Sequence, residues 1–97
     1  MPFTVIAKVT SKPGHEKEIE AGCIEMAAKV RAEPDTLTYI MLRSTKNPAV
    51  IMVYEIYKDE AAFQFHSKTP YMAELFAKLD GRTESVEVEM LTEFARK

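Results

Sequence analysis

The sequence predicts an α+β fold in which helices cover one face of a four-stranded antiparallel sheet. Four segments are rich in β-branched or alternating apolar residues, and the segments between them show a helical period or a cluster of turn residues. The chain of 97 residues is long enough for one hydrophobic core. We therefore expect a single domain that spans residues 1–97.

A strand and a long helix are expected first. Residues 3–10 are rich in β-branched side chains, which pack well on a sheet. After a turn cluster at residues 11–14, apolar side chains recur at spacings of three and four. They are Ile19, Cys23, Met26, Ala27 and Val30. The pattern predicts a helix over residues 15–32, which Pro34 brings to an end.

A hairpin and a first short helix should follow. Residues 36–44 and 49–57 read as strands, and the short connection between them indicates an antiparallel pair. Asp59 is suited to cap a helix over residues 60–67, because its carboxylate can accept a hydrogen bond from a free backbone amide.

The Thr69–Pro70 pair separates this helix from the next one. Thr69 can cap the new helix, and Pro70 suits its first position, where no backbone donor is needed. The expected buried stripe consists of Met72, Leu75, Phe76 and Leu79. An alternating segment over residues 84–94 predicts the last strand. The order β-α-β-β-α-α-β is that of a ferredoxin-like fold.

The third strand predicts an uncovered sheet face. Apolar side chains occupy both of its faces, with Val50, Met52, Tyr54 and Ile56 on one and Ile51, Val53 and Tyr57 on the other. Helices in so short a chain can cover only one face. We therefore expect a homodimer packed sheet to sheet, since two-fold symmetry is the commonest way to cover such a surface.

Composition excludes several classes of partner. The net charge is -2 and the basic residues are scattered, so no nucleic-acid surface is expected. The longest apolar run, residues 49–54, is too short to span a membrane. One cysteine fits a reducing compartment, and the first residues do not resemble a signal peptide. The expected location is the cytoplasm.

His66 is the first candidate for chemistry. It follows Phe63 and Ala62 by one helical turn, so the three share a side of their short helix. If that side faces the sheet, the imidazole is either a core group held by one hydrogen bond, to Glu55 for example, or a functional group that acts as a general acid/base or orients a substrate.

Glu55 is the second candidate, a carboxylate on an apolar strand face. Burial of such a group is costly without a partner. Three alternatives are open: the histidine holds it, it orients the imidazole, or it lies in solvent at the strand end.

Aromatic residues surround these two candidates. Most are expected in the core, and Tyr71 is the exception because it starts a helix beside the expected pocket. The histidines and the cysteine lack the spacing of a metal site, and no glycine-rich phosphate loop occurs. No metal is therefore expected.

A series of short motifs runs through most of the chain. They are Pro13-Gly14-His15, Arg31-Ala32-Glu33-Pro34, Leu37-Thr38-Tyr39, Tyr54-Glu55-Ile56-Tyr57, Asp59-Glu60-Ala61-Ala62-Phe63, His66 and Thr69-Pro70-Tyr71. In this order they resemble the antibiotic biosynthesis monooxygenase domain family. Its members are small dimeric α+β barrels that include quinol monooxygenases and anthrone oxygenases.

The resemblance implies an oxidoreductase that uses neither a metal nor an organic cofactor. A small quinol or anthrone-like aromatic would meet oxygen in a pocket between sheet and helices. His66 would be the general base, Glu55 its orienting group and Tyr71 a hydrogen-bonding wall. The substrate-binding residues would be Phe63, Tyr71, Tyr57 and Phe76.

Other functions remain open on the same fold. The motif order is also similar to isomerases that process phosphorylated autoinducer-2, although only Lys58 and Lys68 lie near it to bind a phosphate. A ligand-binding dimer without turnover is a third reading. Haem-degrading relatives use a tryptophan and a first-strand asparagine, whereas this chain has no tryptophan and carries Val5 and Ile6 there.

Overall fold

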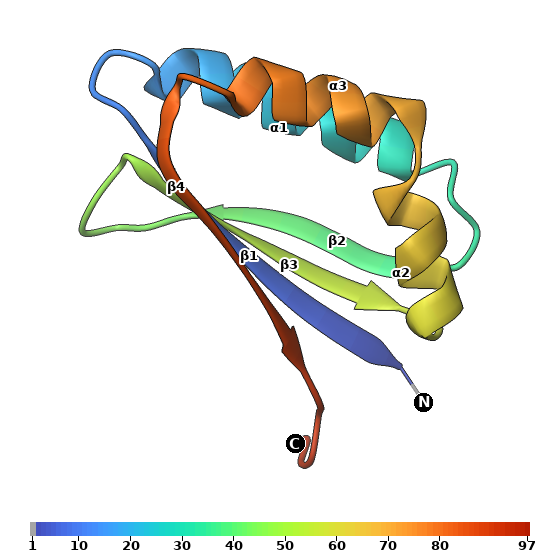
Figure 1. Cartoon of the computed structure of the whole chain (residues 1–97). Coiled ribbons are helices and arrows are strands. Elements are labelled where there is room, and N and C mark those ends of the chain that lie inside the picture. The colour runs from blue at the N-terminus through green and yellow to red at the C-terminus, as the bar shows by residue number, and fades with distance from the viewer. Residues whose placement is uncertain (1) are drawn as a thin grey trace.

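The computed structural model describes residues 2–97 and shows the predicted order of elements (Figure 1). The elements are β1 (Phe3–Ser11), α1 (Glu16–Val30), β2 (Thr36–Arg43), β3 (Val50–Tyr57), α2 (Glu60–Ser67), α3 (Pro70–Leu79) and β4 (Thr83–Leu91). The sheet order is β2-β3-β1-β4, and every neighbouring pair is antiparallel. The predicted α+β, ferredoxin-like fold is confirmed.

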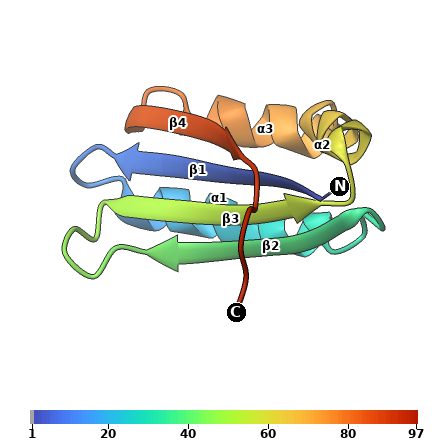
Figure 2. The ribbon, with the colours of Figure 1, turned by 90° about the horizontal axis from the view of Figure 1, so that it is seen from below.

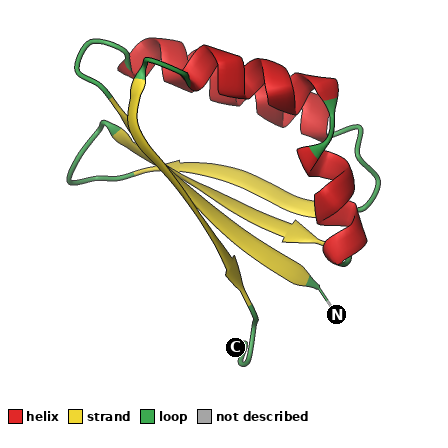
Figure 3. Ribbon diagram, in the orientation of Figure 1, coloured by secondary structure: helices red, strands yellow, loops and turns green. Residues whose placement is uncertain are grey.

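The helices lie on one side of the sheet (Figure 3). Helices α1 and α3 run side by side above it, and α2 stands at the end where β3 finishes (Figure 1). The inner face of the sheet carries Val5 and Val9 of β1 and Ile51 and Val53 of β3, all buried. Val9, Ile51 and Val53 pack with apolar residues of α1 and α3, which include Ile19, Cys23, Met26, Leu75 and Leu79. Val5 packs instead with Tyr57 and Ala62.

The last strand is shorter than the sequence predicts. It ends at Leu91, whereas its alternating pattern suggested that it reaches Phe94. Leu91 pairs with Thr4 and β1 begins at Phe3, so the neighbouring strand offers almost nothing further to pair with. The remaining residues leave the sheet edge and cross its outer face (Figure 2), and Phe94 is 98% exposed.

Two side-chain caps define the bend between α2 and α3. Asp59 accepts a hydrogen bond from the Ala62 amide at 2.9 Å and so starts α2. Thr69 accepts one from the Met72 amide at 3.3 Å and donates to the His66 carbonyl at 2.8 Å. The Thr69 hydroxyl thus joins the end of α2 to the start of α3, which fixes where His66 lies.

Over β2 and β3 the outer sheet face is apolar, whereas Lys8 of β1 and Glu87 and Glu89 of β4 lie on the same face. None of the helices described covers it (Figure 2). Ile40 and Leu42 of β2 are 46% and 52% exposed. Their partners across the strand pair are Tyr54 and Met52 of β3, which are half-buried. This is the uncovered face that the composition of β3 indicates.

Replacing Thr69 with alanine should lower the free energy of unfolding by about 1–2 kcal/mol, the usual value of such a cap. The variant loses both the acceptor for the Met72 amide and the donor to the His66 carbonyl. Urea unfolding followed by circular dichroism measures the difference. Thr69→Ser keeps the hydroxyl and should stay close to wild type, and equal losses in both variants would contradict the capping role.

Candidate functional site

A largely apolar cavity lies between the inner sheet face and helices α2 and α3. Its volume is about 120 Å³. The sheet contributes Val5, Ala7 and Val53, and the helices contribute Phe63, Met72, Leu75 and Phe76. Val86 and Val88 of β4 complete one side. A cavity of about 150 Å³ is known to hold a benzene molecule, so this one suits a single aromatic ring.

The cavity opens between α3 and β4. Phe76 was expected in the buried stripe of its helix, but it is 48% exposed. Its ring lines the cavity beside Val86 and Val88, which are also exposed, so it borders the opening rather than the core. A ligand larger than one ring can extend through this side.

Glu55 is the one charged side chain among the described residues that line the cavity. It is buried, and the Tyr57 hydroxyl donates a hydrogen bond to it from two residues along the same strand face. Loss of hydration raises the pKa of Glu55 from 4.5 to about 7, with a further contribution from the charge of Glu33, while the bond from Tyr57 opposes the shift. A carboxyl group with this pKa can take and return a proton near neutral pH.

Glu33 is a second buried carboxylate, which the sequence did not reveal as functional. It follows α1 and accepts hydrogen bonds from three side chains. Thr36 donates at 2.7 Å, His66 Nδ1 lies 3.1 Å from each carboxylate oxygen, and the Tyr71 hydroxyl donates to Oε2. These donors compensate for the cost of burying the charge. The one signal in the sequence was an acid before Pro34, where acids are usually solvated.

His66 lies behind the cavity rather than on its wall. Its side chain is 1% exposed, so this side of its helix faces the interior. Nδ1 contacts Glu33, not Glu55, and the ring packs against Tyr39 and Tyr57 at centroid distances of 5.5 and 5.4 Å. Among residues 2–97, Nε2 has no hydrogen-bond partner.

The other expected site residues divide into two groups. Phe63 and Phe76 line the cavity with Glu55, whereas Tyr57 is fully buried and supports Glu55 from the side. Tyr71 binds Glu33 and does not line this cavity; burial, followed by the bond to Glu33, raises its pKa to about 12. Tyr39, taken from the sequence as a core aromatic, lies on the cavity wall.

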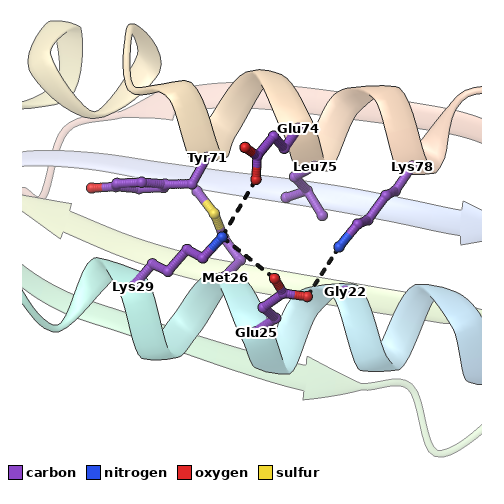
Figure 4. Close-up of a pocket in the computed structure, with 8 residues that line it drawn as sticks. All are labelled: Gly22, Glu25, Met26, Lys29, Tyr71, Glu74, Leu75 and Lys78. Atoms are coloured by element: carbon purple, nitrogen blue, oxygen red, sulfur yellow. Dashed lines mark hydrogen bonds and ion pairs between the residues drawn. The ribbon is translucent and has the colours of Figure 1, made fainter.

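A second depression, between α1 and α3, is bridged by ion pairs (Figure 4). Lys29 lies 3.4 Å from both Glu25 and Glu74, and Lys78 lies 3.0 Å from Glu25. The space is about 10 Å³, barely that of one water molecule. In Figure 4 the Tyr71 ring points away from these pairs, toward the end of α1 that precedes Glu33. This depression joins the helices and offers no room for a substrate.

Within residues 2–97, no three His, Cys, Asp or Glu side chains gather where they could hold a metal ion. None of the helices described is both long and apolar enough to cross a membrane.

Comparison with known proteins agrees with this architecture. The sequence model of the antibiotic biosynthesis monooxygenase family matches residues 2–78. The crystal structure of PA3566 from Pseudomonas aeruginosa is similar with a TM-score of 0.91 and 26% identity, over 97% of this chain and 95% of that one. No curated protein matches.

Two further structures share the fold. Rv0793 from Mycobacterium tuberculosis has a TM-score of 0.92 and 22% identity, over 99% of this chain and 98% of that one. An antibiotic biosynthesis monooxygenase has a TM-score of 0.90 and 23% identity, over 96% and 99% of the two chains.

The raised pKa of Glu55 predicts a pH-dependent stability. Between pH 4.5 and about 7, the Glu55 carboxyl group is protonated in the native state but ionised in the unfolded chain. Its contribution to the free energy of unfolding is therefore fully present below pH 4.5 and is lost as the pH rises to about 7. We expect Glu55→Gln, which cannot ionise, to gain about 3 kcal/mol relative to wild type between pH 4 and pH 8.

Urea unfolding at pH 4, 6 and 8 measures this difference. Glu84→Gln replaces an exposed acid near the start of β4 and should track wild type at every pH. A Glu55→Gln curve parallel to that of wild type would show that Glu55 titrates normally in the folded protein.

Proposed function

Because the chain belongs to the antibiotic biosynthesis monooxygenase family, we propose that it oxidises a small quinol or anthrone-like aromatic with molecular oxygen. The observation that carries the proposal is Glu55, a buried carboxyl group with a pKa of about 7 on the wall of an apolar cavity. The cavity removes water from a flat aromatic, and Glu55 is placed to accept its proton.

The proposed roles differ from those expected from the sequence. Glu55, rather than His66, is the proposed base, because Glu55 lines the cavity while the Nδ1 of His66 is occupied by Glu33. Tyr57 holds the carboxyl group through its hydroxyl. His66 is a positioning residue whose ring supports Tyr39 and Tyr57, and Phe63 and Phe76 contact the ligand.

The reaction balances with an anthrone as the reductant. Glu55 takes a proton from the ring methylene, and the resulting anion transfers an electron to oxygen and combines with it to form a peroxide anion. The protonated Glu55 returns its proton to this anion, which becomes a hydroperoxide. The remaining carbon–hydrogen bond and the oxygen–oxygen bond then break, which leaves a new carbonyl and one water. The methylene loses four electrons, and the oxygen molecule gains four. The substrate therefore supplies every electron.

The lining of the cavity favours this proposal over the isomerase. A phosphorylated substrate would require cationic side chains or a cluster of amides. Among the described residues that line the cavity there is no lysine or arginine, and the charged group present is an acid. An uncharged aromatic suits such a wall, whereas a phosphate would be repelled by Glu55.

A homodimer packed through the outer sheet face is part of the proposal. Ile40, Leu42 and Met52 lie on a face that no helix covers. A stable interface buries roughly 1,200–2,000 Å² in total, which a four-stranded sheet can supply from both copies. Pairing about a two-fold axis buries this apolar surface on both subunits at once.

Oxygen uptake tests the proposed reaction. Naphthohydroquinones and anthrones are supplied to wild type, Glu55→Gln and His66→Asn, and autoxidation is subtracted. We expect saturable uptake in wild type and a loss of about 10²-fold or more in Glu55→Gln, the usual size of a general-base effect. His66→Asn keeps a donor toward Glu33 and should lose much less.

Two results of the oxygen-uptake experiment would contradict the proposal. A larger loss in His66→Asn than in Glu55→Gln would return the base role to His66. Absence of enzyme-dependent uptake on every substrate in the panel would contradict the oxygenase.

Sedimentation equilibrium tests the dimer. Wild type at micromolar concentration should have about twice the monomer mass of 11.0 kDa. Ile40→Glu places a charge on the outer face and should dissociate it, because an unpaired buried charge opposes association. Ile24→Glu alters an isoleucine of α1 that is 64% exposed on the helical side and should remain dimeric. A monomeric wild type would remove this part of the proposal.

A further inference from the structure

We propose that Tyr39 donates a hydrogen bond to an oxygen of the substrate, while Glu55 accepts a proton from the substrate. Two groups on adjacent strands would then recognise the ligand. The inference rests on the proposed function, because it concerns the same cavity. It adds a catalytic residue that the sequence did not single out and assigns the group that recognises the oxygen of the ligand.

Tyr39 and Glu55 face the cavity together. They are directly paired across β2 and β3, so both side chains lie on the same face of the sheet. Both line the cavity, and on the other side Glu55 is paired with Val5, an apolar residue. The polar contacts of a ligand with this part of the floor must therefore be made with Tyr39 and Glu55.

The tyrosines around the site differ in what their hydroxyls contact. Tyr57 donates to Glu55, and Tyr71 donates to Glu33. Within residues 2–97, the Tyr39 hydroxyl makes no hydrogen bond to protein. The hydroxyl is not fully buried, since His66 Nε2 is the fully buried side-chain polar atom without a partner in this part of the chain. A ligand oxygen that replaces water at the cavity wall can therefore accept its hydrogen bond. Its free donor distinguishes Tyr39 from the other two.

Tyr39 remains a donor throughout the working pH range. Burial, followed by the negative charge of Glu55, raises its pKa above the usual value of 10. The ring is held at a centroid distance of 5.5 Å from that of His66, which Glu33 fixes in turn. A neutral phenol held in this way stabilises the oxygen of a ligand as that oxygen becomes negative.

The test compares two ligands that differ by one oxygen, 1-naphthol and naphthalene. Neither is the substrate, so binding can be measured without turnover by fluorescence titration. We expect Tyr39→Phe to bind 1-naphthol about tenfold more weakly than wild type does, and naphthalene equally well. Tyr54→Phe, which removes a hydroxyl from the opposite face of β3, should leave both affinities unchanged.

A second readout separates hydrogen bonding from a general loosening of the cavity. The absorbance of bound 1-naphthol reports its ionisation. A donor from Tyr39 favours the anion, so we expect the pKa of the bound ligand to rise by about one unit in Tyr39→Phe. If Tyr39 had only a structural role, Tyr39→Phe would weaken the binding of both ligands equally and leave the pKa of bound 1-naphthol unchanged.

The outcomes separate this inference from the proposed function. Selective loss of 1-naphthol binding in Tyr39→Phe, without oxygen uptake on the quinol panel, would support Tyr39 and contradict the oxygenase. Equal affinity of the variant and wild type for 1-naphthol would overturn the role of Tyr39, even where uptake is observed. Failure of wild type to bind either ligand would also overturn it.

Discussion

The Glu33 carboxylate is the contact on which the arrangement of the site depends. It follows the end of α1, accepts a bond from Thr36 at the start of β2, and also binds His66 of α2 and Tyr71 of α3. One buried acid therefore connects four elements. Its charge would be costly in the interior without these donors, and the donors would be unsatisfied without the acid. These contacts fix the positions of α2 and of Tyr71 relative to the end of α1 and the start of β2.

The two buried acids have different environments and therefore different chemistry. Glu33 is surrounded by donors and has a structural role. Glu55 has one donor, Tyr57, and an apolar cavity in front of it, and its pKa is raised to about 7. The charge of Glu33 contributes to that rise. A fully bonded acid thus makes its neighbour easier to protonate, the division of roles that proton transfer requires.

Local patterns in the sequence account for most of the fold and for part of the site. The caps Asp59 and Thr69 and the apolar run of β3 are short-range features, and the structure agrees with all three. Glu33 could not be assigned in this way, because its partner His66 is 33 residues away. Tyr39 was treated as core for the same reason, since a strand pattern does not show which buried positions border a cavity.

The sequence by itself determined the order of elements, the ferredoxin-like topology and the apolar outer face, because periodicity and turn residues act over a few neighbours. It also identified Glu55 and His66 as the unusual polar groups on apolar surfaces. Only the tertiary structure decided that His66 pairs with Glu33 and that Glu55 and Tyr39 share the cavity wall. Those relations depend on strand register and on the packing angle of α2, and both are set by contacts between segments distant along the chain.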